Sequence, residues 1–304
     1  NTFAMRLPSA MAGLGTLILL YLAAKKIYGK HIALISMAAL SVSTLFVWSS
    51  RISYLEGVEV FFITLSLYLF FCAMEKDVYF IWLGIALGLT LITKYTSFYL
   101  LLFIILFLLF NKREIFFNKK FIVGAILCFA IISPVIFYNI EVYKTRGHLD
   151  VQFSHLFPSM FDAAKKDWPI LYNDKPAPTH LWDNFVNIRS SMKGGFSLPF
   201  YYFILISIIY IFVREFLFFR EKNTQGLSLA LLCAIFMFLF IPPTTRYLPV
   251  FLPLIAMALG VCVYDISYIF SKKKLSIFIW TVFILLFGFE YIYNYNTNHN
   301  TPNA

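Results

Sequence analysis

Long apolar runs separated by short polar segments recur from one end of the chain to the other. Runs of this length suit helices that cross the ~30 Å hydrocarbon core of a membrane. The expected helices, about ten, cover residues 8–24, 31–48, 57–74, 78–93, 95–110, 121–138, 198–219, 227–241, 247–270 and 275–293. The pattern therefore predicts an all-α integral membrane protein.

One connection, residues 139–197, is much longer than the others and lies on one side of the predicted membrane. Loops of this length are usually functional or disordered. Its aromatic residues favour an ordered cap at the membrane interface. The expected parts are N-terminal transmembrane helices in 1–138, an extracytoplasmic loop in 139–197, C-terminal transmembrane helices in 198–293 and a frayed, Asn-rich extracytoplasmic tail in 294–304.

Composition supports a membrane protein. The 304 residues are 61% hydrophobic and only 13% charged, whereas a soluble domain is nearer half apolar and a quarter charged. The four cysteines, at 72, 128, 233 and 262, each lie inside an apolar run and form no CxxC pair. We expect them to be small buried side chains, and they say nothing about the redox compartment.

The net charge of +10 is distributed unevenly between the two sides of the membrane. Cations cluster in alternate loops, at 25, 26 and 30, at 76, at 112, 113, 119 and 120, at 214, 220 and 222, and at 272–274. The positive-inside rule makes these loops cytoplasmic. The opposite short loops carry one cation each, Arg51, Lys94 and Arg246. Because topology explains the basic charge, we expect no nucleic-acid partner.

This topology places residues 1–7 outside. The chain begins Asn-Thr-Phe and has neither the charged region nor the cleavage site of a signal peptide. A cytoplasmic N-terminus would then require at least one further helix and an outside loop before Asn1. We expect a multi-pass protein of the plasma (inner) membrane, with its site on the extracytoplasmic side.

The stretch WSSRISYLEGVEVFF places Arg51, Glu56 and Glu59 between two apolar helices. A charge at the centre of a membrane helix costs about 2.5–3.5 kcal/mol, so these groups should reach water or a partner. Snorkelling to the interface is one explanation. Glu56 and Glu59 also share a helix face near an N-terminus that favours carboxylates.

A site that handles a phosphate and a proton is the alternative explanation. Cations bind phosphate and stabilise its charge as it leaves, and a carboxylate takes the proton from an attacking hydroxyl. Glu56 and Glu59 could act with Arg51, Lys94 and Arg246, which are all predicted on the same side. Glu59 has the weaker case, because it could equally face water or a neighbouring helix.

Two further segments lie on that side. The run from Ser133 is expected to leave its helix through Pro134 and Asn139, and it carries His148, Asp150 and His155. These last three have side chains that bind metals, although their spacing matches no strict metal motif.

The run FIPPTTRYLPVFLPL puts Arg246 and Tyr247 between paired prolines. Pro242 and Pro243 should break the helix. The break is either an ordinary turn or irregular backbone that lines a cavity.

Several motifs in order carry a resemblance to a known family: MRLPSAMAGLGTLILLYLAAKKIYGK, SRISYLEGVEVFF, GIALGLTLITKYTSFYLLL, PVIFYNIEVYKTRGHLDVQFSHLF and TTRYLPVFLPLIAMALG. This order resembles the GT-C membrane glycosyltransferases, which include protein O-mannosyltransferases and the aminoarabinose transferases of lipid A. The resemblance covers most of the chain and is strongest in residues 5–157 and 242–260. Its specificity lies in the order and spacing of the motifs, none of which is strict.

The resemblance implies transfer of a sugar, with inversion, from a polyprenyl-phosphate donor to a hydroxyl acceptor on the outer face. The acceptor class includes lipids, glycans and proteins. The principal catalytic Asp of such enzymes lies in the first outside loop, which would precede residue 1. Glu56 stands where the family has an acid, more often Asp, and would support that Asp.

The remaining implied roles concern binding. Donor phosphate would contact Arg51, Lys94, Arg246 and Tyr247, and substrate would contact Asn139, His148 and His155. No cofactor is indicated, and a divalent metal is an alternative that rests on His148, Asp150 and His155.

Three other functions remain open. A lipid or glycolipid transporter also needs charges in a polar cavity, but transporters commonly show repeats and paired broken helices, and the sequence has no internal repeat. A polysaccharide polymerase or ligase would use a diphosphate donor. A non-catalytic protein that binds lipid-linked sugar is the third. Formation of a glycosidic bond, and the donor that it requires, would separate these functions.

Overall fold

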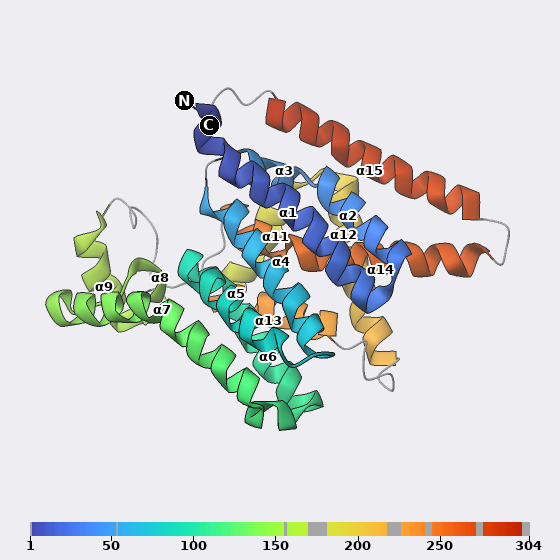
Figure 1. The fold of residues 1–304 in the computed structure, drawn as a ribbon. Helices are drawn as coiled ribbons and strands as arrows, with labels where there is room; N and C mark the ends of the chain where they lie inside the picture. Colours follow the sequence, from blue (N-terminus) through green and yellow to red (C-terminus); the bar gives the residue numbers. More distant parts are fainter. Residues whose placement is uncertain are drawn as a thin grey trace.

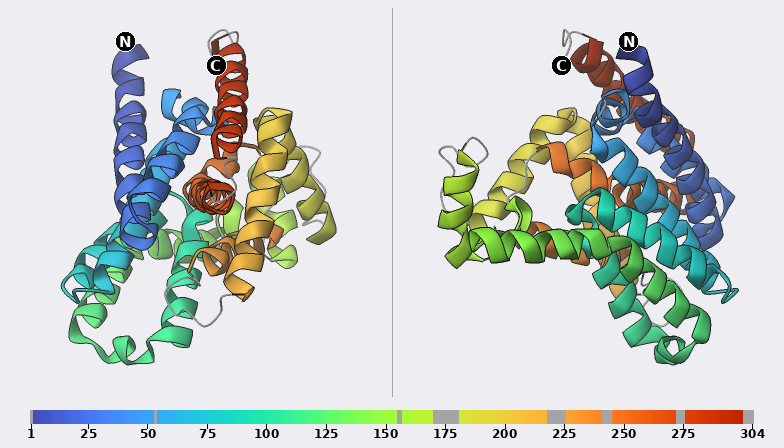
Figure 2. Two further views of the ribbon diagram at one scale, coloured as in Figure 1. Left: turned by 90° about the vertical axis from the view of Figure 1, so that its right-hand side faces the viewer. Right: turned by 60° about the vertical axis from the view of Figure 1, so that its left-hand side comes forward.

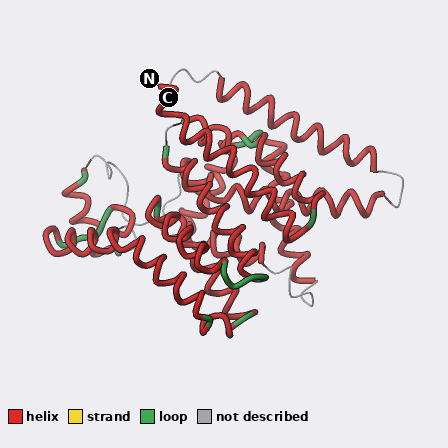
Figure 3. The backbone as a smooth tube through the Cα atoms, in the orientation of Figure 1, coloured by secondary structure: helices red, strands yellow, loops and turns green. Residues whose placement is uncertain are grey.

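A computed structural model describes residues 2–52, 54–154, 157–169, 181–217, 226–240, 245–271 and 276–299. These residues form helices joined by short turns and contain no strand (Figure 3). The expected all-α architecture is confirmed. Figure 1 shows the helices gathered into one bundle, with α7 at its edge.

The first helices are α1 (Thr2–Tyr28), α2 (Lys30–Val42), α3 (Thr44–Arg51) and α4 (Leu55–Ala73). The sequence predicted a single helix over 31–48, which is wrong. The chain bends by 64° between α2 and α3, where Ser43 is extended. The Glu290 carboxylate accepts a hydrogen bond from the Thr44 backbone N–H at 3.0 Å. A distant residue thus satisfies the backbone at the break, which local periodicity cannot reveal.

The next segment contains α5 (Tyr79–Thr93), the short 3₁₀ helix η1 (Tyr95–Ser97), α6 (Phe98–Asn111), η2 (Arg113–Phe117) and α7 (Lys119–Arg146). The prediction that the helix from 121 ends near 138 is wrong, because α7 continues through Pro134 and Asn139. Membrane helices tolerate proline when neighbouring groups satisfy the backbone. The helix ends at Gly147, whose φ of 76° is left-handed.

The long connection is largely helical where the structure describes it. Beyond the end of α7 it contains α8 (Val151–Ser154), α9 (Pro158–Asp167) and α11 (Leu181–Gly195). Figure 1 shows α8 and α9 beside the outer end of α7, away from the main bundle. The segment expected as a loop therefore begins inside a helix and forms a helical cap.

The C-terminal part comprises α12 (Leu198–Leu217), α13 (Gly226–Phe240), η3 (Thr245–Phe251), α14 (Leu252–Ser271) and α15 (Ser276–His299). The expectation that residues from 294 are frayed is wrong up to His299, because α15 includes them. Asn294 and Asn298 are buried, and their side chains are hydrogen-bonded to each other at 2.5 Å. Packing of α15 on α3 explains why this Asn-rich sequence is ordered.

Helix burial defines the inside and outside of the bundle. In the most apolar stretch of each segment, 89% of the residues of η3–α14 are buried. The corresponding share is 17% in α15 and 11% in α7. The right-hand view in Figure 2 shows α7 at the front of the bundle. It contacts α5 closely, because a Cβ on Gly84 would lie 2.0 Å from the Gly124 carbonyl oxygen. Glycine at these two positions therefore lets the two backbones touch.

Six of the described helices are long and apolar enough to cross a membrane, or seven if α2 and α3 form one broken span. Three shorter apolar helices are Tyr79–Thr93, Tyr95–Asn111 and Gly226–Leu239. The chain is a multi-pass membrane protein. The expected total of about ten spans stays a prediction.

Candidate functional site

Three segments that are far apart in the sequence meet at Glu56. This residue lies in the first turn of α4, Lys94 directly follows α5, and Arg246 lies in η3. Lys94 Nζ donates to Glu56 Oε1 at 2.7 Å, and Arg246 Nε donates to the same oxygen. The predicted association of Glu56 with Lys94 and Arg246 is therefore present in the structure.

The position of Glu56 depends on a close approach between α3 and α4. A Cβ on Gly57 would lie 2.8 Å from the Ser49 carbonyl oxygen, a distance that real Cβ atoms do not adopt. Glycine next to Glu56 therefore allows the start of α4 to pack against the last turns of α3. The first turn of a helix also favours a carboxylate, because the dipole is positive there.

Aromatic rings hold the two cations. Lys94 Nζ lies 4.1 Å from the centre of the Tyr247 ring, and Arg246 Cζ lies 4.5 Å from the centre of the Tyr54 ring. Cation–π attraction of this kind is stronger where water is excluded. Tyr54 was not identified from the sequence. Its only signal was an aromatic residue two positions before the acid.

Two cations are in direct contact with one carboxylate at this site. The Glu56 side chain is 0% exposed, that of Lys94 is 9% exposed and that of Arg246 is 50% exposed. One buried carboxylate thus stands against two cations, and the more exposed cation can reach an anionic ligand. Glu56 Oε2 has no hydrogen-bond partner in the described part of the chain, so it remains able to accept one.

Glu59 and Arg51 occupy different places from Glu56. The Glu59 side chain is fully buried, and its Oε1 accepts hydrogen bonds from Thr96 Oγ1 at 2.5 Å and Ser97 Oγ at 2.6 Å. Arg51 donates through Nη1 to the Asn298 carbonyl at 2.8 Å. This hydrogen bond joins α3 to α15, and Arg51 forms no ion pair with Glu56 in the part of the chain that the structure describes.

The candidate ligands in the cap are held by protein contacts. Asn139 Oδ1 accepts from the Asp150 backbone N–H at 2.9 Å. His148 is buried, with Nδ1 2.8 Å from the Leu149 carbonyl oxygen and Nε2 3.0 Å from Asp167 Oδ2. His148 therefore pairs with Asp167, a residue that sequence spacing did not single out.

The metal alternative gains no support from this geometry. Within the described ranges, no group of three His, Cys, Asp or Glu side chains could hold a metal ion. His155, which completed the predicted set, lies outside the described residues, so its predicted role stays a prediction.

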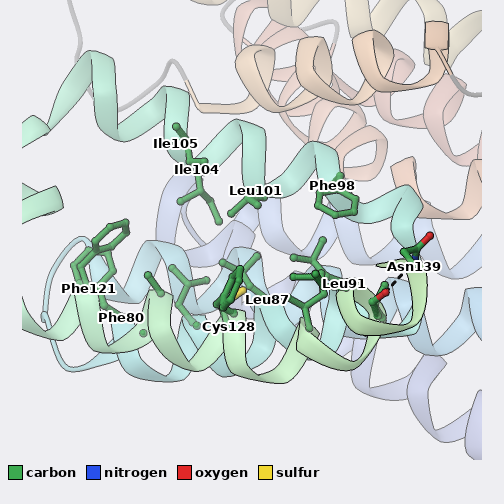
Figure 4. A pocket seen from close by; sticks show the side chains of 18 of the residues that line it. Phe80, Leu87, Leu91, Phe98, Leu101, Ile104, Ile105, Phe121, Cys128 and Asn139 are labelled. Carbon is green, nitrogen blue, oxygen red and sulfur yellow. Dashed lines mark hydrogen bonds between the residues drawn. The ribbon is translucent and has the colours of Figure 1, made fainter. Parts of the chain in front are cut away.

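An apolar groove lies between α5, α6, α7 and α8. Its volume is about 490 Å³. Figure 4 shows Phe80 and Phe121 at one end and Asn139 at the other, with Leu87, Leu91 and Leu101 between them. Phe80 and Leu91, which both line the groove, are separated by roughly 16 Å along the axis of α5.

The end of the groove lies next to the turn that carries Lys94. Leu91 and Phe98 line the groove on either side of this turn in the sequence, and Phe153 of α8 also lines it. The Tyr95 and Phe153 rings are 4.6 Å apart. The apolar groove therefore ends near Lys94, one of the two cations that pair with Glu56. The groove could not be predicted from the sequence, because its residues resemble any other apolar helix positions.

Comparison with known families bears on this combination. Residues 1–138 match the family model described as dolichyl-phosphate-mannose-protein mannosyltransferase. The chain resembles the GT-C glycosyltransferases, as its motifs predicted. The matched GT-C region contains Glu56 and Lys94, whereas Arg246 lies beyond it.

Two relatives extend the GT-C comparison. An uncharacterized protein of Aquifex aeolicus (strain VF5) is 26% identical over 304 residues, covering 94% of this chain and 54% of that protein. YkcB of Bacillus subtilis (strain 168), named a candidate mannosyltransferase, is 31% identical over 134 residues, covering 42% of this chain and 18% of YkcB. The chain thus spans about half or less of the length of these relatives.

Solved structures of an oligosaccharyltransferase from Archaeoglobus fulgidus have the same fold. The apo form aligns with a TM-score of 0.59 at 16% identity, over 96% of this chain and 44% of that one. AglB in complex with an inhibitory peptide and a dolichol-phosphate aligns with a TM-score of 0.54 at 16% identity, over the same shares of the two chains. This likeness supports a GT-C-type fold for the chain.

Proposed function

We propose that this chain is a membrane glycosyltransferase that moves a sugar from a polyprenyl-phosphate donor to a hydroxyl acceptor on the extracytoplasmic side, with inversion. The observation that carries the proposal is that two cations, Lys94 and Arg246, pair with Glu56 beside the end of an apolar groove. A polyprenyl phosphate has the matching chemistry, because it joins an anion to a long apolar chain.

The phosphate would lie against Lys94 and Arg246. Arg246 presents a planar guanidinium that suits phosphate oxygens, and its side chain is half exposed. The Tyr247 ring contacts Lys94, and the Tyr54 ring contacts Arg246. Stabilisation of the leaving phosphate by fixed cations is a large source of rate enhancement in such transfers.

The polyprenyl chain would lie in the groove between α6 and α7. Its lining is apolar apart from Asn139, and α7 itself is mostly exposed on the outside of the bundle. A lipid chain could therefore enter sideways from the bilayer. Burial of each CH₂ group contributes about 0.8 kcal/mol, so even part of the chain would anchor the donor.

The reaction forms one bond and breaks one. The acceptor hydroxyl oxygen attacks the anomeric carbon from the face opposite the phosphate, and the bond from that carbon to the phosphate oxygen breaks. The hydroxyl proton passes to a carboxylate, and polyprenyl phosphate leaves. Glu56 already accepts from two cations, so its role is to orient Lys94 and Arg246. The principal base implied by the family resemblance would be the Asp of the first outside loop.

The test uses the full-length protein in proteoliposomes with a radiolabelled polyprenyl-phosphate sugar and a set of hydroxyl acceptors. Glu56→Gln and Arg246→Gln should each lower kcat/KM by about 100-fold, because each loses a charge-assisted contact in the transition state. Lys76→Gln, which changes an exposed lysine, is the matched control and should transfer sugar at the wild-type rate.

Other outcomes would favour other functions. Movement of a labelled glycolipid across the bilayer with no new glycosidic bond would mean a transporter. Transfer from a polyprenyl-diphosphate donor but not from the monophosphate would mean a polymerase or ligase. Wild-type transfer by Glu56→Gln would contradict the role given to Glu56.

A further inference from the structure

Glu59 lies one turn along α4 from Glu56, but its contacts are of a different kind. Its side chain is 0% exposed, and its Oε1 accepts from the hydroxyls of Thr96 and Ser97. Both of these partners are also fully buried. Through Oε1 the carboxyl group is placed to hold these two hydroxyls, whereas Oε2 has no hydrogen-bond partner among the described residues.

The two hydroxyls belong to η1, the short turn between α5 and α6. Lys94 immediately precedes this turn, in an extended conformation that ends α5. Within the turn, the Ser97 backbone N–H donates to the Lys94 carbonyl over 3.4 Å, a long hydrogen bond. Further backbone bonds join the Lys94 N–H to the Thr90 carbonyl at 3.2 Å and the Phe98 N–H to the Tyr95 carbonyl. The Glu59 carboxyl group adds two shorter side-chain contacts to the turn.

The position of Lys94 matters because its ammonium must satisfy two neighbours at once. Nζ lies 2.7 Å from Glu56 Oε1 and 4.1 Å from the centre of the Tyr247 ring. A long lysine side chain has many rotamers, and its ordering carries an entropic cost. An anchored backbone restricts where Nζ can lie.

We propose that Glu59 is a positioning residue that fixes the turn through Thr96 and Ser97 and thereby sets the place of Lys94 over Glu56 and Tyr247. The consequence for catalysis rests on the proposed function, in which Lys94 contacts the donor phosphate. The two acidic residues that share a face of α4 thus have separate tasks. Glu56 binds the cations directly, and Glu59 places one of them through the chain.

The first experiment does not depend on catalysis. Reductive methylation of the full-length protein, followed by mass spectrometry, measures how accessible each lysine is. In Glu59→Ala, Lys94 should react about tenfold faster than in the wild type, because the turn has lost both side-chain contacts. In Glu59→Gln, Lys94 should stay protected, because the amide oxygen can still accept from both hydroxyls.

Matched controls separate this effect from general loosening. Lys26 pairs with Glu75 at 2.5 Å, away from the turn, so its reactivity should not change in Glu59→Ala. Glu75→Ala should expose Lys26 and leave Lys94 protected. The double substitution Thr96→Val with Ser97→Ala should reproduce Glu59→Ala, and it keeps the proposal testable if Glu59→Ala fails to fold.

A kinetic experiment reads out the consequence for the donor. Glu59→Ala and the Thr96→Val/Ser97→Ala variant should raise the donor KM about tenfold, and Glu59→Gln should restore it. A merely structural role would lower the yield and the Tm but leave the KM of the folded fraction unchanged, which would overturn the proposal.

The outcomes distinguish this proposal from the proposed function. Unchanged Lys94 protection in Glu59→Ala would overturn the positioning role, whatever the activity. Loss of protection in Glu59→Gln as large as in Glu59→Ala would also overturn it, because charge rather than acceptor geometry would then be required. An inactive wild-type protein in which Lys94 still responds as expected would contradict the proposed function alone.

Discussion

At the scale of single residues, the ion pairs at Glu56 couple stability to the site. A buried carboxylate that loses a partner becomes partly uncompensated, which costs more than the pair contributes. Lys94→Met should therefore lower the free energy of unfolding by about 3 kcal/mol. Adding Glu56→Gln to Lys94→Met should recover part of that loss, because the buried charge is then gone.

Thermal unfolding in detergent micelles measures both variants and the single Glu56→Gln. Lys76→Met is the control, because Lys76 is exposed and its substitution should leave the Tm unchanged. These variants form a double-mutant cycle. If the two single substitutions changed the stability by amounts that simply add in the double variant, Glu56 and Lys94 would not be coupled.

The cap contains a second charged group, outside the membrane-spanning helices. His148 and then Arg146 hold the pKa of Asp167 below its ordinary value of 3.8 through hydrogen bonds. Because the folded-state pKa is the lower one, Asp167 stabilises the cap above pH 3.8, and this contribution is lost as the pH falls through the folded-state pKa. Acidification should then release α9 from α7.

Trp168 reports this release, because its ring lies 4.8 Å from that of His148. Its fluorescence, measured as the difference from Trp168→Phe, should change as the pH falls below 3.8. Asp167→Asn should abolish the transition, whereas Asp162→Asn on the same helix should leave it in place. A transition that persists in Asp167→Asn would assign it to another group.

At the scale of helices, one carboxylate on α15 serves two other elements. Glu290 Oε1 accepts from the backbone N–H and the hydroxyl of Thr44 at 3.0 and 2.7 Å, and Oε2 accepts from the Ser197 backbone N–H at 2.8 Å. Thr44 begins α3 and Ser197 precedes α12. The N–H groups at the start of a helix have no acceptor within that helix. The Glu290 side chain supplies an acceptor at both helix starts.

Glu290→Ala should leave both buried N–H groups without an acceptor and lower the free energy of unfolding by about 3 kcal/mol. Glu290→Gln retains an acceptor and should lose less. Thermal unfolding compares these variants with Glu141→Ala, which removes an exposed carboxylate from α7 and should have no effect. Equal Tm values for Glu290→Ala and Glu141→Ala would show that α15 does not stabilise the break between α2 and α3.

At the scale of the whole molecule, the groove and the two cations that pair with Glu56 should act on different parts of the donor. Ala125 lines the groove on α7, so Ala125→Trp should fill it. We expect this variant to raise the KM for a long-chain polyprenyl-phosphate donor by about tenfold, with little change for a donor whose chain is too short to enter the groove.

Ala130→Trp is the matched control, since Ala130 is exposed on α7 but is not among the groove residues. It should leave the KM for both donors unchanged. Equal effects of Ala125→Trp on long and short donors would place the lipid chain elsewhere.

The all-α architecture could be predicted from the apolar periodicity. Periodicity is a local property, because a run that crosses a bilayer must satisfy its backbone as a helix. The positions of Glu56, Lys94 and Arg246 at helix ends could be predicted for the same reason. The motifs that contain these residues also carried the family resemblance. The sidedness inferred from the loop charges stays a prediction.

Tertiary structure alone decided which of these groups meet. Glu56 pairs with Lys94 and Arg246, Glu59 binds a turn, and Arg51 contacts α15, although the sequence offered all of them as site candidates, with Glu59 the weakest. Sequence spacing orders side chains along one helix, whereas these contacts depend on how separate helices pack. The break after α2, the continuation of α7 and the groove depend in the same way on neighbours that are distant in the chain.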